Sequence, residues 1–375
     1  METTGYIPRH SGRHAAPASR TVRMAVSGAA AVTLIGGGAA IAAAASARLA
    51  PHPCAAAARP GCGGAPADVA AAAPAARVFS GYGLRGPAAA AASGGRLWVA
   101  SVLGNSLTEL AGGSGVRLRT LGGSGYPFRG PNAVAAGGGH VWVANVPADT
   151  VTEVSAATGR LERSLSAGYG FSSPYALALS RRRLWVANAG GDSVTEIDTR
   201  TGQRIGVLAG RGCGLDNPYA LAVSAGRLWV ANAGGRSVTE VAISTGTCVA
   251  RLAAGYGLND PAALAVAGSR LWVASEAGDA VTEIDTADGR LVRILAGPRY
   301  GFDNPAALAV CGGRLWVANS LGDSVTEIDP GSGTFLRTLG GGRYGLRNPA
   351  GLAVAGPAVW VMNLGGNSIT RLRLG

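Results

Sequence analysis

The sequence contains no lysine, so arginine supplies every permanently positive side chain. The 33 basic residues give a net charge of +12 and are spread along the 375 positions. Their longest run, residues 181–183, has no aromatic residues between its members. Nucleic-acid-binding domains gather their basic residues on one face. We therefore expect no binding of nucleic acid, and we expect the run to be a solvated turn.

Familiar catalytic motifs are missing as well. The sequence has no serine nucleophile elbow, phosphate-binding loop, Cys-X-X-Cys pair or His-Glu-X-X-His helix. Its Gly-X-Gly strings open turns between apolar runs, whereas a dinucleotide-binding fingerprint must lead into a helix. We therefore expect no catalytic residue, no cofactor and no metal site.

Charge is absent from residues 24–47, which follow a segment with four arginines and one acid. This pattern is typical of an export signal or an N-terminal membrane anchor, which we assign to residues 1–47. Residues 45–47, Ala-Ser-Ala, suit a signal peptidase, whereas the long charged segment favours a retained anchor, and both interpretations stay open. The rest of the chain is expected to be secreted or anchored to the outer face of the cytoplasmic membrane.

Cysteine is scarce, and its total of five is odd. Cys54 and Cys62 lie in residues 48–75, an Ala/Pro/Gly-rich stretch that we expect to be a linker and in which they could form a local disulfide. The others occupy non-equivalent points of the sequence repeat described next, so the sequence does not pair them. Cys213, Cys248 and Cys311 are expected to be small buried apolar side chains.

The seven tryptophans recur at steps of 43 or 44 residues, at positions 98, 142, 185, 229, 272, 316 and 360. A period of this length is typical of a propeller built from small sheets. A proline and, before it, a tyrosine recur on the same schedule in every unit, except that Cys213 replaces one tyrosine. The sequence therefore predicts an all-β fold, a seven-bladed β-propeller, over residues 76–375.

Each unit contains four short apolar runs separated by turn residues. In the unit that begins at Gly168 the runs are about 175–179, 184–188, 193–198 and 203–209. They are rich in Val, Ile, Leu and Trp and are bounded by Gly, Asp or Asn, as expected for strands and turns. We call them strands A, B, C and D of a four-stranded blade.

The ends of the chain predict how the ring closes. The last unit stops after its strand C, at residues 367–372, while residues 77–80 precede the first unit and match the strand D pattern. A ring of sheets must join its last blade to its first or leave an open edge. We therefore expect the N-terminal strand to complete the seventh blade. Deleting 77–80 should unfold the ring, and deleting 48–75 should do little.

The repeat Leu-Trp-Val-Ala-Asn, Gly-Asp-Ser-Val-Thr-Glu-Ile-Asp, Thr-Gly, shown best by residues 184–202, resembles the YVTN and NHL class of β-propeller repeats. It differs from the WD type, which has Trp-Asp where this chain has Trp-Val. The chain is also similar to the streptogramin B lyases (virginiamycin B lyase type), which share a seven-bladed ring. That resemblance implies elimination chemistry that relies on histidines, an acid and a divalent metal, and this chain lacks those histidines.

The charged residues of the repeat are predicted to be structural. His140 occupies the position of a recurring arginine at the A-to-B turn. It is expected to be a solvated turn residue that is isolated from the tyrosine loops, which lie on the other face of the ring. A glutamate recurs in strand C, and the loop length places Arg183 opposite Asp198, which predicts a cross-strand ion pair. Strand A, which lines the centre of a propeller, reads Ala-Leu-Ala-Val at 263–266, so the central wall is expected to be inert.

A binding face is predicted where the D-to-A and B-to-C loops meet, because loops carry function on rigid scaffolds. The best leads are the departures from the repeat, namely residues 126–128, Cys213, Arg236 and Glu276. The candidate contact residues are Tyr82, Tyr126, Phe128, Asn145, Tyr169, Asn188, Asn232, Arg236, Tyr256, Glu276, Tyr300, Asn319, Tyr344 and Asn363.

Two functions are compatible with these observations. The favoured one is a monomeric, noncatalytic propeller outside the cytoplasm that binds a protein, a peptide or a cell-envelope glycan on this face and meets the membrane only through its N-terminal segment. The alternative is an enzyme of the streptogramin lyase or gluconolactonase type. The missing histidines and the acid-free central wall argue against the enzyme.

Overall fold

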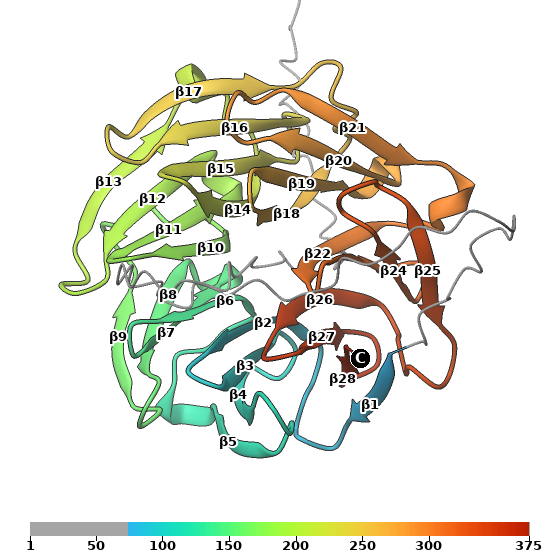
Figure 1. The fold of residues 1–375 in the computed structure, drawn as a ribbon. Helices are drawn as coiled ribbons and strands as arrows, with labels where there is room; N and C mark the ends of the chain where they lie inside the picture. The colour runs from blue at the N-terminus through green and yellow to red at the C-terminus, as the bar shows by residue number, and fades with distance from the viewer. Residues whose placement is uncertain (1–73, 375) are drawn as a thin grey trace, which may run out of the picture.

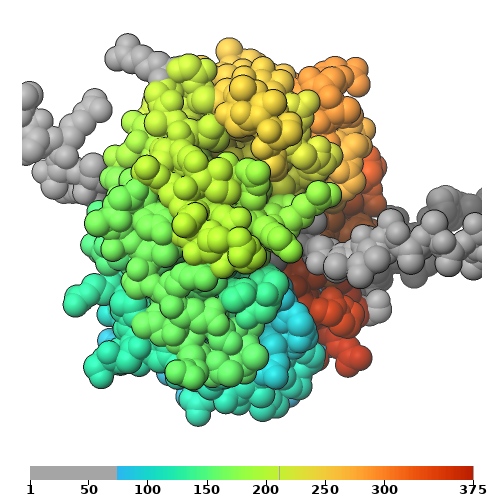
Figure 2. Space-filling model, turned by 90° about the vertical axis from the view of Figure 1, so that its left-hand side faces the viewer, coloured from blue at the N-terminus to red at the C-terminus, as the bar shows by residue number. Residues whose placement is uncertain are grey.

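The computed structural model describes residues 74–374, in which seven four-stranded antiparallel sheets are arranged around a common axis (Figure 1). The predicted seven-bladed β-propeller is therefore confirmed. Edge-on, Figure 2 shows residues of successive blades following one another around the rim. The predicted signal or anchor and most of the predicted linker, with Cys54 and Cys62, lie outside the described residues.

We number the blades along the chain. Blade 1 consists of β2 (Pro87–Ser93), β3 (Arg96–Ser101), β4 (Ser106–Ala111) and β5 (Arg117–Leu121). Blade 2 consists of β6 (Pro131–Gly137), β7 (His140–Asn145), β8 (Thr150–Ser155) and β9 (Leu161–Leu165). Blade 3 consists of β10 (Pro174–Ser180), β11 (Arg183–Asn188), β12 (Ser193–Asp198) and β13 (Arg204–Ala209). Blade 4 consists of β14 (Pro218–Ser224), β15 (Arg227–Asn232), β16 (Ser237–Ala242) and β17 (Thr247–Leu252).

The other blades repeat this order. Blade 5 consists of β18 (Pro261–Ala267), β19 (Arg270–Ser275), β20 (Ala280–Asp285) and β21 (Leu291–Ala296). Blade 6 consists of β22 (Pro305–Cys311), β23 (Arg314–Asn319), β24 (Ser324–Ile328) and β25 (Phe335–Gly340). Blade 7 consists of β26 (Pro349–Val354), β27 (Ala358–Asn363), β28 (Ser368–Arg373) and β1 (Ala75–Phe79).

The only helices in the described part of the chain are single 3-10 turns in the loops. They are η1 (Gly123–Gly125), η2 (Val146–Ala148), η3 (Ala189–Gly191), η4 (Arg211–Cys213), η5 (Glu276–Gly278) and η6 (Pro298–Tyr300). Between residues 74 and 374 the structure contains no helix of the length and hydropathy needed to cross a membrane.

The N-terminal strand closes the ring, as predicted. Strand β1 pairs antiparallel with β28, with Ala75 opposite Arg373 and Phe79 opposite Ile369. The two ends of the propeller therefore meet in one sheet, which leaves no blade incomplete.

The tryptophans pack between the blades. Each lies in the second strand of its blade and is at most 3% exposed. In blade 3, Trp185 lies opposite Ala178 of β10 and Glu196 of β12. The small alanines of strand A make room for the indole ring, which is why the Trp and Ala positions keep the same period.

The cross-strand register is also confirmed, although the expected ion pair in blade 3 is wrong. Arg183 lies opposite Asp198 in the ladder. Its guanidinium group instead binds the carboxylate of Glu196, while Asp198 accepts hydrogen bonds from the backbone N–H groups of Arg200 and Thr201. The turn uses Asp198 to hold its own backbone, as aspartates commonly do.

Candidate functional site

The asparagines that end strand B are buried, which corrects their prediction as contact residues. Each is 0% exposed. In blade 4 the Nδ2 atom of Asn232 donates to Thr239 Oγ1 at 3.0 Å, and Thr239 Oγ1 donates to the carbonyl of residue 213 at 2.9 Å. The same link from asparagine to the strand C threonine recurs in the other blades that carry the asparagine, at Asn145, Asn188, Asn319 and Asn363. These side chains hold the D-to-A loop on its blade.

The recurring tyrosines connect neighbouring blades rather than facing a partner. Their hydroxyl groups donate to the carbonyl of a C-to-D turn glycine in the following blade, at 2.6–2.9 Å, for Tyr126, Tyr169, Tyr256 and Tyr300. Tyr300, Tyr344 and Phe128 are buried, and Tyr82, Tyr126, Tyr169 and Tyr256 are half-buried. The prediction of a binding surface is therefore corrected for the buried Tyr300, Tyr344 and Phe128, whereas the half-buried tyrosines keep part of their surface exposed.

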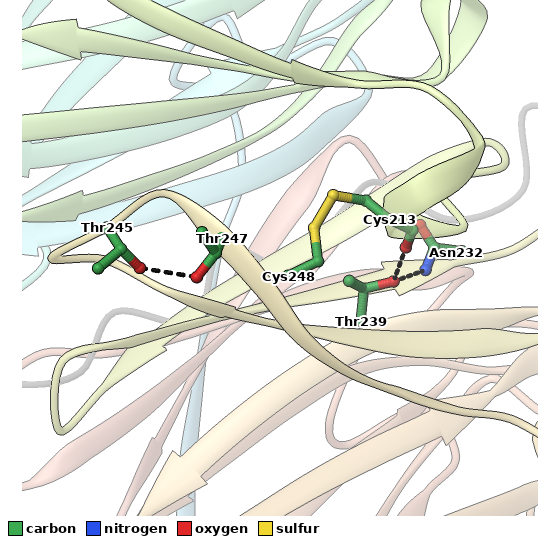
Figure 3. The surroundings of a disulfide bond; sticks show 6 residues. All are labelled: Cys213, Asn232, Thr239, Thr245, Thr247 and Cys248. Carbon is green, nitrogen blue, oxygen red and sulfur yellow. Dashed lines mark hydrogen bonds between the residues drawn. A yellow bond between two sulfur atoms is a disulfide. The ribbon is translucent and has the colours of Figure 1, made fainter.

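In the one unit that lacks this tyrosine, a disulfide takes its place. Cys213, at the end of η4, is bonded to Cys248 in β17, 35 residues further along (Figure 3). The bond ties the loop that enters blade 4 to the outer strand of that blade. Elsewhere the tyrosine hydroxyl ties the same loop to the turn before the outer strand. The expectation of free apolar cysteines is therefore wrong for this pair, and Cys311 is the free cysteine of the described residues.

A second recurring link joins the blades at the end where the B-to-C loops lie. An aspartate or asparagine oxygen accepts from the backbone N–H that precedes the next blade's proline, at 2.6–2.8 Å. The acceptors are Asn105, Asp149, Asp192, Asp279, Asp323 and Asn367. Blade 4 has the exposed Arg236 at this position, which accepts no hydrogen bond. At the junction between blades 4 and 5, the residue at this position therefore cannot accept the hydrogen bond that links the other blades.

Polar side chains gather near the axis beside this junction. The residue after the strand A proline is alanine in four blades, but it is Asn132, Tyr175 and Tyr219 in blades 2, 3 and 4. The rings of Tyr175 and Tyr219 stack with centroids 3.9 Å apart, and their hydroxyl groups hydrogen-bond each other. Asn132 donates to the carbonyl of Tyr175 at 3.3 Å. The inner wall is thus polar on this side, which corrects the expectation that it is inert.

Glu276 belongs to the same group of residues. It opens the B-to-C loop of blade 5, and its backbone N–H donates to the carbonyl of Asp260 at 3.0 Å. Its side chain is 7% exposed, and Oε1 has no hydrogen-bond partner among the described residues. The amide of Asn304 acts on this carboxyl group and is fixed by Ser320, whose hydroxyl donates to Asn304 Oδ1 at 2.5 Å.

We call these residues the axial cluster: Asn132, Tyr175, Tyr219, Asp260, Glu276, Asn304 and Ser320. Sequence reasoning identified Glu276 among them and missed the rest. A signal was present, since Tyr175 and Tyr219 interrupt a position that is otherwise small, and Asp260 alone puts a carboxylate before a strand A proline.

Burial controls the protonation of the axial cluster. It raises the pKa of Glu276 to about 8, and the neighbouring carboxylate of Asp260 acts in the same direction while the hydrogen bond from Asn304 opposes it. Burial also raises the pKa of Asp260, partly offset by the charge of Arg236. The pKa of Tyr175 and that of Tyr219 rise for the same main reason. At neutral pH, Glu276 is therefore mostly protonated, and both tyrosines keep their protons.

The opposite side of the axis is apolar at this end of the ring. Blades 7 and 1 contribute Ala88 and Ala350, both 0% exposed, with Val102 and Leu364 packed against them. One side of the axis thus carries carboxyl, amide and phenol groups, whereas the alanines of blades 7 and 1 are packed away from solvent.

A separate groove lies at the other end of blades 3 and 4. It encloses about 1240 Å³ between their A-to-B turns and includes residues 181–183 and Arg227. Arg183 and Arg227 pair with Glu196 and Glu240, while Arg181 and Arg182 are exposed, as expected for a solvated turn. The groove carries no buried unpaired acid or base, so the axial cluster is the stronger candidate site.

His140 lies at that same end of the ring, away from the tyrosine loops, and its side chain is partly exposed, as predicted. Its Nδ1 atom is 2.7 Å from Glu162 Oε2 and 3.0 Å from Glu153 Oε1. The sequence did not predict this contact with two acids. The recurring strand C glutamates bind turn arginines in other blades, as in Arg96 with Glu109 at 2.5 Å, so most of these charges are structural, as predicted.

Comparison with known structures confirms the fold. The chain is similar to virginiamycin B lyase from Staphylococcus aureus (15% identity, TM-score 0.68, covering 80% of this chain and 99% of the lyase). It is also similar to Kuenenia stuttgartiensis hydrazine synthase (18% identity, TM-score 0.65, 78% and 96%). A third similar structure is that of the RRP9 WD40 repeats (14% identity, TM-score 0.67, 81% and 99%).

These similarities define a class, the seven-bladed propellers, and leave the activity open. Both enzymes and WD40 repeats share the fold at low identity, so the resemblance to the streptogramin B lyases is confirmed as one of architecture. The sequence matches no protein-family model and no curated protein.

Proposed function

We propose that the protein is a noncatalytic binding module that acts outside the cytoplasm and captures a peptide or protein segment carrying a free amine. The observation that carries this proposal is the buried Glu276, whose Oε1 has no partner among the described residues. A buried polar atom left unpaired costs about 1–3 kcal/mol, and such atoms are retained where a ligand satisfies them. An ammonium group donates up to three hydrogen bonds and would suit Glu276 and Asp260 together.

Two further observations support this function. The stacked rings of Tyr175 and Tyr219 are near enough to Glu276 and Asp260 for the charges of these acids to help raise the pKa of both tyrosines, and aromatic faces favour cations. The Cys213–Cys248 disulfide is typical of proteins outside the reducing cytoplasm. The disulfide agrees with the signal or anchor predicted for residues 1–47.

The test is a titration calorimetry series with a blocked pentapeptide, four glycines around a central lysine, and its acetyl-lysine counterpart. We expect the lysine peptide to bind at least 10-fold more tightly than the acetylated one, because acetylation removes the charge. Glu276→Gln should weaken lysine binding by a similar factor, whereas Asp303→Asn, which removes an exposed acid from a neighbouring loop, should not. Equal binding of both peptides would refute the proposal, and preferential binding of glucosamine oligomers would replace the peptide with a glycan.

The second candidate is a propeller enzyme of the lyase or lactonase type. It is favoured by the pKa of about 8 at Glu276, which suits an acid or base near neutral pH. A structure similar to this chain is that of a catalytically inactive variant of virginiamycin B lyase with quinupristin. Incubation with quinupristin and with simple lactones, followed by chromatography and mass spectrometry, separates the two functions. A binding module leaves both unchanged, elimination opens the depsipeptide ring without a change of mass, and hydrolysis adds one water.

A further inference from the structure

Blade 2 contains a group of metal-ligand side chains at the A-to-B end of the ring, away from the axial cluster. His140 begins β7, Glu153 lies in β8 and Glu162 lies in β9, so three adjacent strands contribute one side chain each. One ligand atom from each of the three lies within 4.8 Å of the other two. Imidazole nitrogen with carboxylate oxygen is a donor set that Zn²⁺ accepts.

Two departures from the repeat create this group. The position of His140 is an arginine in blades 1, 3, 4, 5 and 6. Glu162 lies where the register between the third and fourth strands shifts, directly before the partner of Glu153. The equivalent residues in the other blades with this shift are aliphatic: Leu118, Ile205, Val249, Val292 and Leu336. Blade 2 has therefore lost a permanent positive charge and gained a carboxylate at the same place.

The proton on His140 cannot satisfy both acids. Its Nδ1 atom lies 2.7 Å from Glu162 Oε2, with which it forms a hydrogen bond. Glu153 is 0% exposed, and its Oε1, 3.0 Å from the same nitrogen, has no hydrogen-bond partner among the described residues. The Nδ1–H group of His140 can donate to only one of the two acceptors. Because it donates to Glu162, the buried Oε1 of Glu153 faces the imidazole without a hydrogen bond.

The strand C glutamates of other blades show which ion pair Glu153 lacks in blade 2. In blade 1, Glu109 binds both Arg96 and Arg119, and in blade 5, Glu283 binds Arg270 and Arg293. In blade 2 only Arg163 remains, at 2.8 Å from Glu153 Oε2. The position taken by the second guanidinium group in those blades thus lacks a permanent cation in blade 2.

We propose that His140, Glu153 and Glu162 bind a divalent transition-metal ion, Zn²⁺ in particular. Ligands about 2.0–2.1 Å from a tetrahedral zinc ion are roughly 3.3 Å apart. The spacings from His140 Nδ1 to Glu162 Oε2 and to Glu153 Oε1, 2.7 and 3.0 Å, therefore need to widen by about 0.6 and 0.3 Å. Arg163 holds the other oxygen of Glu153 and so orients the carboxylate, as partners of metal ligands commonly do. The side chains of His140 and Glu162 are 36% and 34% exposed, which leaves the fourth position open to water.

The test is titration calorimetry of the full chain with zinc chloride, using two variants that restore residues found in other blades. His140→Arg introduces the arginine of five other blades, and Glu162→Leu introduces the leucine of blades 1 and 6. We expect the wild type to bind one zinc ion more than His140→Arg. Glu162→Leu should bind that ion at least 10-fold more weakly. Glu196→Gln, which changes the strand C glutamate of blade 3, serves as the matched control and should bind zinc as the wild type does.

A thermal scan gives a second measurement that does not depend on stoichiometry. Zinc should raise the unfolding midpoint of the wild type, EDTA should reverse the rise, and the rise should be absent from His140→Arg and smaller in Glu162→Leu. Equal zinc binding by the wild type and His140→Arg would overturn the proposal, since the zinc would then be held by other residues. The zinc test and the peptide test are independent, because the zinc test varies His140 and Glu162 whereas the peptide test varies Glu276.

Discussion

A single carboxyl group, that of Glu276, dominates the electrostatics of the axial cluster. Its burial and the nearby Asp260 both disfavour the ionised form, which raises its pKa to about 8. The same group provides the unpaired oxygen on which the proposed function rests. A residue that is costly to the fold and is placed beside two tyrosines is the kind that binding sites retain.

This pKa predicts a pH-dependent stability difference between the wild type and Glu276→Gln. Between pH 4.5 and 8 the folded protein keeps a proton that the unfolded chain has released. The contribution of Glu276 to the free energy of unfolding is therefore largest below pH 4.5 and falls as the pH rises to 8. The wild type should lose on the order of 3–5 kcal/mol relative to the variant over this range.

Urea unfolding of both proteins at pH 5 and pH 8 measures the difference. Glutamine does not titrate, so the comparison cancels the contributions of all other ionisable groups. Stability curves that run parallel across this range would show that Glu276 ionises normally.

At the same scale, the sequence located only part of the candidate site. Glu276 and Arg236 were recognised because they replace residues that recur in other blades. The asparagines and tyrosines were misjudged, because a recurring polar residue in a loop is compatible with exposure and with a buried hydrogen bond alike. Only the three-dimensional structure shows that Asn232 points at Thr239 rather than at solvent.

Among the elements, blade 4 differs most from the repeat. It lacks the tyrosine that binds a turn carbonyl, and it lacks the aspartate that holds the next blade. The Cys213–Cys248 disulfide replaces the first link. The exposed Arg236 replaces the aspartate, and the pKa of Asp260 responds to its charge. The axial cluster is therefore built where the regular connections between blades are changed.

The disulfide is predicted to stabilise the whole propeller, since it closes a loop of 35 residues. The chain-entropy argument gives about 2–4 kcal/mol for a loop of this size. The double variant Cys213→Ser/Cys248→Ser should lower the free energy of unfolding by that amount. Chemical denaturation with and without a reductant measures it.

The matched control is Cys311→Ser, which removes the free cysteine and should leave the effect of the reductant unchanged. If the wild type and the double variant unfold at the same denaturant concentration without reductant, the disulfide contributes nothing to stability. In that case the contacts around η4 hold the loop alone.

For the whole molecule, the closure of the ring is predicted to be important for stability. Strand β1 completes blade 7 by pairing with β28 from the other end of the chain. Without it, the outer edge of that blade is open and Trp360 loses its contact with Phe79, whose ring centroid lies 5.4 Å away.

A chain that begins at residue 81 should therefore lack a cooperative thermal transition or unfold at a much lower temperature than the full chain. A chain that begins at residue 74 keeps β1 and serves as the control, with a midpoint close to that of the full chain. Differential scanning calorimetry of the three proteins measures these midpoints. Equal midpoints for the chains beginning at 74 and 81 would contradict closure by β1.

The sequence alone determined the blade number, the strand order, the register of the second and third strands and the closure. Each of these follows from local periodicity: tryptophans every 43 or 44 residues, apolar runs of strand length, and a strand D pattern that stands before the first unit instead of after the last. The tryptophans and the apolar runs recur in every blade, whereas closure rests on the single strand D pattern before the first unit.

Only the tertiary structure decided which polar residues meet. The axial cluster joins side chains from five blades, and the His140 group depends on a shift of register between two strands. The disulfide depends on how closely a loop approaches an outer strand. These contacts are set by the packing of blades around a ring, which brings together single departures from the repeat that lie far apart in the chain. The periodic part of the sequence therefore specifies the ring. The residues that depart from the repeat come into contact only when the blades pack around the axis.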